Sequence, residues 1–123
     1  TAIASLHRIP PNEGVGYGLE DTANYERILA TLPVGYADGY PRSLSNGRGH
    51  VVVRGERVPV VGKVCMDMTM VDVTSVPGAR VGDSVELFGR QLPIVDVAAA
   101  AGTIAYEILS RIPTRVLREQ RGG

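Results

Sequence analysis

The chain has 123 residues, of which 44% are hydrophobic and 21% charged, as in a soluble globular domain large enough for one core. Thirteen basic side chains balance thirteen acidic ones, so charge gives no support for binding to nucleic acid or to an anionic membrane. No apolar run approaches the length of about 18 residues that a membrane-spanning helix needs, and the single cysteine excludes an internal disulfide.

Short apolar runs alternate with turn residues along the chain, which contains 15 glycines and eight prolines. That pattern is typical of a β-rich domain. Apolar and polar residues alternate strongly over Lys63–Val73, which predicts one long strand there. The R-G-E stretch at Arg54–Glu56 predicts a hairpin turn. The expected strands, in chain order, are Ala2–Ile9, Glu26–Val34, His50–Val53, Arg57–Val61, Lys63–Val73, Ser84–Phe88 and Pro113–Arg118.

The character of the sequence changes near the C-terminus. The alanine-rich run Ile94–Ala101 predicts a helix that ends at Gly102. Thr103 is a suitable N-cap for a second short helix. No linker or low-complexity stretch divides the chain, so we expect residues 1–123 to form one domain. The predicted fold class is mainly β, a barrel or sandwich-like domain with a short helical insert near residues 94–109.

The residues that could bind a metal or act as nucleophiles are few. His7 and His50 lie far apart, and Cys65 has no second cysteine at metal-ligand spacing, so we expect no metal site. Among apolar neighbours, Cys65 is more typical of a small core side chain than of a nucleophile, which needs a nearby base. Asp38 is expected to act as a turn residue, and Asp67 as a solvated carboxylate on its strand.

The aromatic residues are unusual, with five tyrosines against one phenylalanine and no tryptophan. A buried phenol needs a hydrogen-bond partner, so a core built for packing alone would favour phenylalanine. Tyr17, Tyr36 and Tyr40 lie in glycine-flanked loops, and Tyr106 lies in the helical insert. Each alone would fit a half-buried turn aromatic, but together they predict a polar pocket lined by phenols. Lys63 is the only lysine, and so the only candidate in this chain for a Schiff base.

Four motifs in this order resemble the C-terminal domain of alanine racemases: V-G-Y-G from Val15, L-P-V-G-Y-A-D-G-Y-P-R from Leu32, V-G-K-V-C-M-D-M-T-M-V-D-V from Val61 and T-I-A-Y-E-I-L-S-R-I-P-T-R-V from Thr103. The resemblance runs from about His7 to Arg118. It implies an isomerase that interconverts L- and D-alanine with pyridoxal 5′-phosphate (PLP). In this family an N-terminal barrel carries PLP on a lysine, and a mainly β domain follows. The chain contains no such barrel, so we expect it to be inactive alone, and its start at Thr1 leads us to expect preceding residues.

The resemblance also implies roles for individual residues. Tyr17 matches the catalytic tyrosine, which moves the α-proton in the partner subunit's active site of a head-to-tail homodimer. Met66 matches the residue whose backbone amide meets the substrate carboxylate, and Tyr36 matches a tyrosine close to the active-site entrance. Tyr106 matches the tyrosine that hydrogen-bonds the PLP phosphate. The residues expected to line the entrance corridor are Arg42, Lys63 and Ile104.

Two departures from the family pattern stand out. Gly16 replaces a serine found in many members, and Lys63 stands where the family often has arginine, so Lys63 is not expected to carry PLP. The implied partners are alanine and the N-terminal PLP barrels of both subunits, with no nucleic acid and no membrane. A cytoplasmic location fits the single cysteine. Two alternatives remain: the matching domain of a racemase for serine or several amino acids, and a stand-alone β domain without catalysis.

Overall fold

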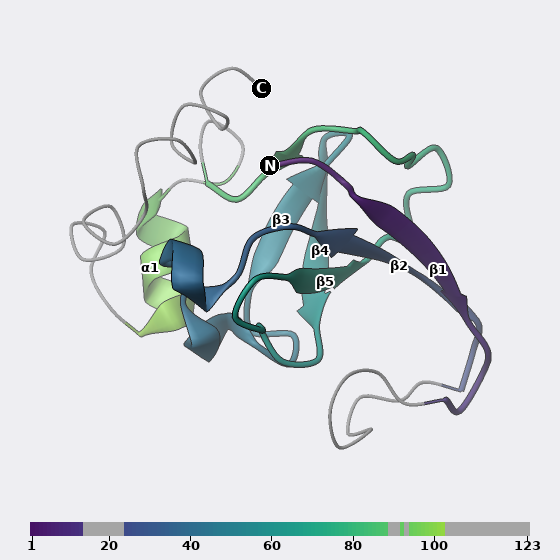
Figure 1. Ribbon diagram of the computed structural model, residues 1–123, viewed down its shortest axis with the longest axis horizontal. Helices are drawn as coiled ribbons and strands as arrows, with labels where there is room; N and C mark the ends of the chain where they lie inside the picture. Colours follow the sequence, from purple (N-terminus) through teal and green to yellow (C-terminus); the bar gives the residue numbers. More distant parts are fainter. Residues whose placement is uncertain (14–23, 89–91, 93, 103–123) are drawn as a thin grey trace.

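The computed structural model describes residues 1–13, 24–88, 92 and 94–102. Within these residues the domain is mainly β with one short α-helix, which confirms the predicted fold class (Figure 1). The strands are β1 (Ser5–Ile9), β2 (Arg27–Leu32), β3 (His50–Val53), β4 (Glu56–Val61), β5 (Thr69–Asp72) and β6 (Val85–Glu86). The helices are two 3₁₀ turns, η2 (Tyr36–Asp38) and η3 (Arg42–Leu44), and α1 (Ile94–Ala101).

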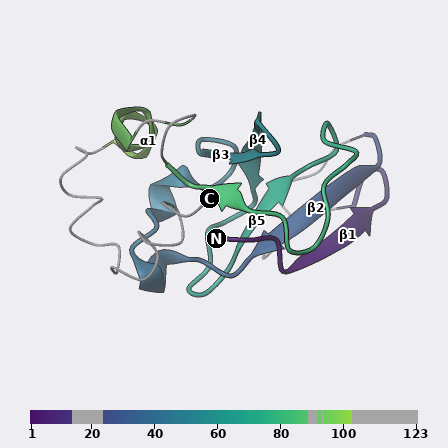
Figure 2. The ribbon, with the colours of Figure 1, turned by 90° about the horizontal axis from the view of Figure 1, so that it is seen from above.

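The six strands form one antiparallel sheet in the order β1-β2-β5-β4-β3-β6. The sheet curls, so that its inner face encloses the core (Figures 1 and 2). Valine is the main core residue of the strands, in keeping with its β-branched side chain. The fully buried strand valines are Val51, Val53, Val58, Val60 and Val71.

The first residues of the chain join the two edges of the curled sheet. Ala2 forms a bridge to Ser84. The Ile3 N–H donates to the Asp83 carbonyl oxygen at 2.9 Å, and the Val85 N–H donates to that of Thr1 at 2.8 Å. This seam, between residues 1–3 and 82–85, closes the barrel next to β6.

The β3–β4 hairpin turns through two residues with positive φ, Arg54 (49°) and Gly55 (81°). This is the backbone of a type I′ turn, and it confirms the hairpin that the sequence predicts. A non-glycine residue at positive φ is uncommon. Here the Arg54 side chain forms an ion pair with Asp83, with 2.9 Å between Nε and Oδ2. A hydrogen bond from the Arg80 N–H and the Arg54 guanidinium together lower the pKa of Asp83.

The prediction of one long strand over Lys63–Val73 is wrong for most of that range, because only Thr69–Asp72 forms a strand. Gly62, with φ of 66°, turns the chain out of β4. The following residues form a loop in which the Cys65 N–H donates to the Met68 carbonyl oxygen at 3.0 Å. The sequence of this segment alternates as in a strand, but its backbone forms hydrogen bonds with a turn and within the loop, and not with a neighbouring strand.

Other predicted bounds shift at their ends. The second strand stops at Leu32 rather than Val34, since Pro33 has no N–H for the ladder. The strands predicted over Ala2–Ile9 and Ser84–Phe88 are shorter in the structure, at Ser5–Ile9 and Val85–Glu86. The helix predicted from Thr103 and the strand predicted over Pro113–Arg118 lie outside the described residues.

The helix α1 has the bounds that the sequence predicts. It ends at Gly102, whose φ of 75° and hydrogen bond to the Ala99 carbonyl oxygen are those of a glycine C-cap. The Ser43 hydroxyl donates to the Ala101 carbonyl oxygen at 2.8 Å, which ties α1 to η3.

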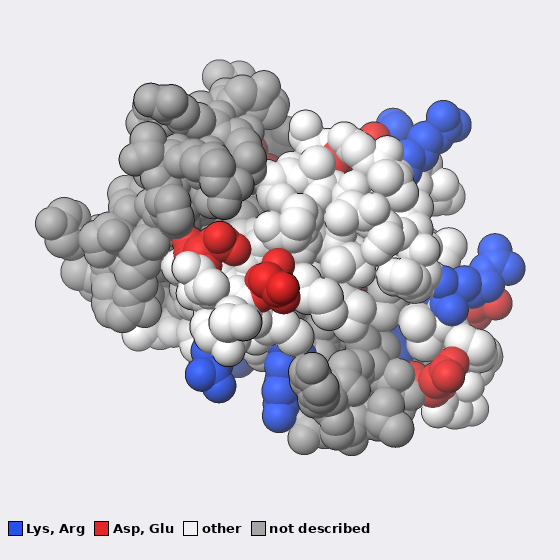
Figure 3. Space-filling view, viewed as in Figure 1, with Lys and Arg blue, Asp and Glu red and all other residues white. Residues whose placement is uncertain are grey.

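The surface carries no dominant charge on the face shown in Figure 3, where acidic and basic side chains are scattered. Over the described part of the chain, no helix has the length and apolar character to cross a bilayer. The same residues include no group of three or more potential metal ligands.

Tyr40 is buried in the core, with only 2% of its surface exposed, and this corrects its expected place in a phenol-lined pocket. Its hydroxyl has no hydrogen-bond partner among the described residues. Burial raises the pKa of the phenol above its usual value of about 10. The neutral ring therefore contributes packing, while its hydroxyl is desolvated without compensation.

We expect Tyr40→Phe to raise the free energy of unfolding by about 1 kcal/mol, since it removes an unpaired buried hydroxyl. The pH dependence should change as well. In the native state Tyr40 keeps its proton, but in the unfolded chain it ionises above about pH 10, so wild-type stability falls as pH rises through that value. Urea unfolding at neutral and alkaline pH should show a smaller alkaline loss in the variant.

Tyr25→Phe is the control for Tyr40→Phe, because Tyr25 is 54% exposed and is not part of the core. We expect it to leave the neutral and alkaline stabilities nearly unchanged. A marked loss of stability in Tyr40→Phe would show that the hydroxyl has a partner, and would contradict the prediction.

Candidate active-site pocket

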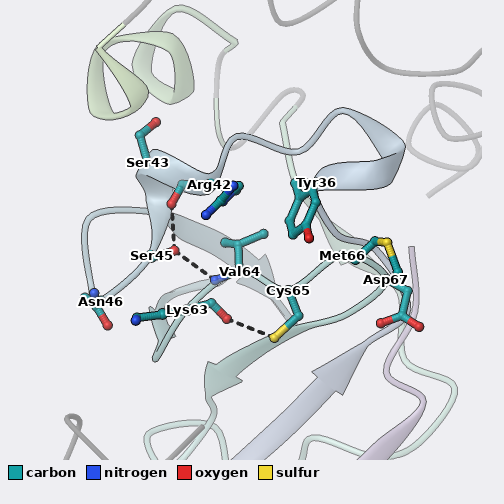
Figure 4. A pocket seen from close by; sticks show the side chains of 10 residues that line it. All are labelled: Tyr36, Arg42, Ser43, Ser45, Asn46, Lys63, Val64, Cys65, Met66 and Asp67. Atoms are coloured by element: carbon teal, nitrogen blue, oxygen red, sulfur yellow. Dashed lines mark hydrogen bonds between the residues drawn. The ribbon is translucent and has the colours of Figure 1, made fainter. Parts of the chain in front are cut away.

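An open pocket of about 650 Å³ lies beside the two 3₁₀ turns (Figure 4). Two segments form it: a first wall, residues 36–46, and a second wall, residues 63–67. The lining residues are Tyr36, Arg42, Ser43, Ser45, Asn46, Lys63, Val64, Cys65, Met66 and Asp67. Tyr36, Arg42, Lys63 and Met66, all singled out from the sequence, thus lie around one cavity.

The short turn η2 places Tyr36 on the first wall. The carboxylate of Asp38, the last residue of η2, accepts a hydrogen bond from the Gly35 N–H at 3.1 Å, and this bond caps the N-terminal end of the turn. Gly39, with φ of 92°, closes the turn by donating its N–H to the Tyr36 carbonyl oxygen at 3.0 Å. The Tyr36 ring is left 42% exposed and faces the pocket (Figure 4).

The two walls approach closely at Gly35. The Tyr36 N–H donates to the Cys65 carbonyl oxygen, and the Ala37 N–H donates to that of Met66, both at 2.9 Å. A Cβ at position 35 would lie 2.2 Å from the Cys65 oxygen and 2.6 Å from Met66 backbone atoms. Gly35 is in the extended region, with φ of −149°, so the close contact and not the backbone angle requires glycine.

Arg42 extends over the pocket from η3. Its guanidinium carbon lies 5.0 Å from the centroid of the Tyr36 ring, a cation–π arrangement. At an exposed site such a contact contributes about 0.5–1 kcal/mol. The contact therefore orients the two side chains toward each other at the mouth of the pocket.

The second wall contains Cys65, whose expected burial in the core is corrected here. Its side chain is only partly buried, and its thiol lies 3.5 Å from the Lys63 carbonyl oxygen, in the loop after Gly62. Asp67 is exposed, as expected, but it lies on this loop and not on a strand.

Met66 and Lys63 are also exposed on the second wall, and the Met66 side chain is 57% exposed. The Met66 N–H donates to no acceptor among the described residues. A backbone N–H in this position can donate to a ligand in the pocket. With the Arg42 and Lys63 cations nearby, the pocket offers several groups to a carboxylate.

Sequence reasoning missed three polar residues of the pocket, Ser43, Ser45 and Asn46. They belong to the run R-S-L-S-N, which resembles any polar loop, so only the fold places them here. Tyr17, Tyr106 and Ile104, which were also singled out, lie outside the described residues.

Comparisons with known proteins agree on one family. Residues 1–120 match the family model described as "Alanine racemase, C-terminal domain". An alanine racemase from Halothermothrix orenii is 50% identical over 98% of this chain and 33% of its own length. One from Stutzerimonas stutzeri is 46% identical over 98% of this chain and 34% of its own. The chain thus spans about a third of the length of the curated relatives it matches.

Solved structures give the same match. The biosynthetic alanine racemase from Pseudomonas aeruginosa superposes with a TM-score of 0.86 at 43% identity, covering 93% of this chain and 32% of that one. The alanine racemase from Bartonella henselae, solved with covalently bound pyridoxal phosphate, has a TM-score of 0.87 at 36% identity, over 93% of this chain and 32% of that one.

Proposed function

The chain belongs to the alanine racemase C-terminal domain family, and we propose that it is the C-terminal domain of a PLP-dependent enzyme that interconverts L- and D-alanine. The observation that carries this proposal is the meeting of Tyr36, Arg42, Lys63 and Met66 around one pocket. These residues come from two separate family motifs, and a pocket is the arrangement that a shared substrate needs.

We assign substrate contacts to the two walls of the pocket. The Met66 N–H donates to the substrate carboxylate, and the Tyr36 phenol lies beside the path by which substrate enters. Arg42 and Lys63 attract the carboxylate of an incoming amino acid. Ile104, outside the described residues, completes the entrance corridor in this proposal.

The pocket fits a supporting role toward an anionic cofactor and its substrate, since the Arg42 guanidinium and the Lys63 ammonium outnumber the one carboxylate in its lining, that of Asp67. When bound, PLP stabilises the carbanion that forms when the α-proton leaves. Lys63 lies at the exposed rim, so we assign the PLP lysine to an N-terminal barrel domain instead. The Tyr106 phenol O–H is proposed to donate a hydrogen bond to the PLP phosphate.

Tyr17 is the proposed catalytic residue of this chain. It lies in the connection between β1 and β2, outside the described residues, so its role rests on the family motif. Its phenol oxygen takes or returns the α-proton on one face of the substrate, and the barrel lysine acts on the other face. We propose that Tyr17 and Met66 serve the partner subunit's site in a homodimer, while Tyr106 serves its own.

A chimeric enzyme tests the proposed function directly. This chain would replace the matching C-terminal third of the Halothermothrix orenii relative, to which it is 50% identical. We expect the purified chimera to bind PLP and to racemise L-alanine, whereas neither part alone should racemise L-alanine. A folded chimera that retains PLP but racemises no amino acid would show that the proposal is wrong.

A further inference from the structure

The two walls of the pocket are joined by one lining side chain as well as by their backbones. The Ser45 hydroxyl accepts a hydrogen bond from the Val64 N–H on the second wall at 2.8 Å. It also donates to the Arg42 carbonyl oxygen on the first wall at 2.6 Å. Figure 4 shows Ser45 between the two segments. The hydroxyl thus uses its donor and an acceptor position in one bridge.

The groups that Ser45 bonds are close to the side chains that line the pocket. Arg42, whose carbonyl oxygen accepts from Ser45, lies over the Tyr36 ring. Val64, whose N–H donates to the hydroxyl, is only 3% exposed and comes two residues before Met66. Because water has poor access to Val64, solvent would replace the lost hydrogen bond poorly.

We propose that Ser45 is a positioning residue, whose hydroxyl holds the Arg42 end of the first wall against Val64 on the second wall. Backbone hydrogen bonds already hold the Tyr36 end. The inference about the walls stands on the geometry alone, and its effect on catalysis rests on the proposed function. Ser45 touches no reacting atom in this proposal. Its loss should therefore weaken substrate capture more than it slows the chemical step.

The rate at which a thiol reagent labels Cys65 can be used to measure the separation of the walls, and no added probe is needed. Cys65 is the only cysteine, lines the pocket and follows Val64 directly. We expect Ser45→Ala to raise its rate of labelling by a thiol reagent about fivefold, the ratio that corresponds to one net hydrogen bond. Ser45→Thr, which keeps the hydroxyl, should restore the wild-type rate.

Ser43→Ala is the matched control. Ser43 also lines the pocket, but its hydroxyl donates outward to Ala101 on α1 and does not join the walls. Its loss should leave Cys65 labelling unchanged. Equal labelling of folded Ser45→Ala and wild type, or an equal rise in Ser43→Ala, would overturn the proposal.

A second pair of variants tests the proposal if Ser45→Ala does not fold. Thr and Val have nearly the same shape, so Ser45→Thr and Ser45→Val differ only by the hydroxyl. Circular dichroism confirms folding before labelling. If only the variants with a hydroxyl fold, Ser45 supports the whole domain, and a role confined to the pocket is overturned.

In the chimera, we expect Ser45→Ala to raise KM for L-alanine about fivefold and to leave kcat within about twofold, with Ser45→Thr close to wild type. A fall in kcat with unchanged KM would overturn the positioning role. If the unmodified chimera does not racemise alanine, the proposed function fails, but Cys65 labelling still decides the role of Ser45.

Discussion

Tyr17→Phe in the chimeric racemase is expected to lower kcat for L-alanine by about 10²–10⁴-fold, the usual contribution of a positioned general acid or base. The variant removes only the phenol oxygen that moves the α-proton. PLP binding should therefore persist, because no cofactor contact is assigned to Tyr17. Steady-state kinetics in both directions, together with PLP content, would measure these two effects separately.

The control for Tyr17→Phe is Tyr25→Phe, which removes an exposed phenol from a residue that does not line the pocket. It should retain wild-type kinetics. Unchanged turnover in Tyr17→Phe would remove Tyr17 from the mechanism. Loss of PLP together with turnover would instead assign it a role in holding the cofactor.

Gly35→Ala is expected to lower the free energy of unfolding by about 2–4 kcal/mol. Its new Cβ would lie 2.2 Å from the Cys65 carbonyl oxygen, a backbone atom that cannot move alone. Separating the walls to relieve this contact breaks the hydrogen bonds that Tyr36 and Ala37 donate to the second wall. Urea unfolding of the chain would measure the loss.

Gly78→Ala is the matched control for Gly35→Ala. A Cβ at position 78 would meet its nearest neighbour, the Arg54 side chain, at an ordinary distance of 3.7 Å. Its stability should stay close to that of the wild type. Equal stabilities of Gly35→Ala and Gly78→Ala would contradict the close approach of the walls. A lower stability of Gly35→Ala alone would support it.

The parts of the fold that the sequence predicts well are those held by local contacts. The helix α1 has a strong local propensity and a glycine stop, and the hairpin between β3 and β4 turns within two residues. The sequence predicts a strand for the loop around Cys65, because the hydrogen-bond partners of this loop, such as Tyr36 and Ser45, are distant in sequence. Alternation of apolar and polar residues does not show which groups form hydrogen bonds with the backbone.

The pocket shows the same limit. Tyr36 and Tyr40 have similar small or turn-forming neighbours, yet one faces the pocket and the other is buried in the core. Tertiary packing alone separates them. Only the family motifs point to Arg42, Lys63 and Met66, since no local rule predicts that an exposed methionine lines a pocket. Ser45 had no signal, since a serine in a polar run has no distinct pattern.

Among the described residues, the seam of the barrel should be the last part to form during folding. It brings together Thr1 and Val85, which are 84 positions apart, whereas the β3–β4 hairpin closes through its two-residue turn. The entropy lost on closing a loop grows with its length, so distant contacts form after local ones. Until the seam closes, the strand edges that it joins are unpaired and can add a strand from another molecule. A newly synthesised domain would therefore be most prone to self-association just before residues 1–3 dock.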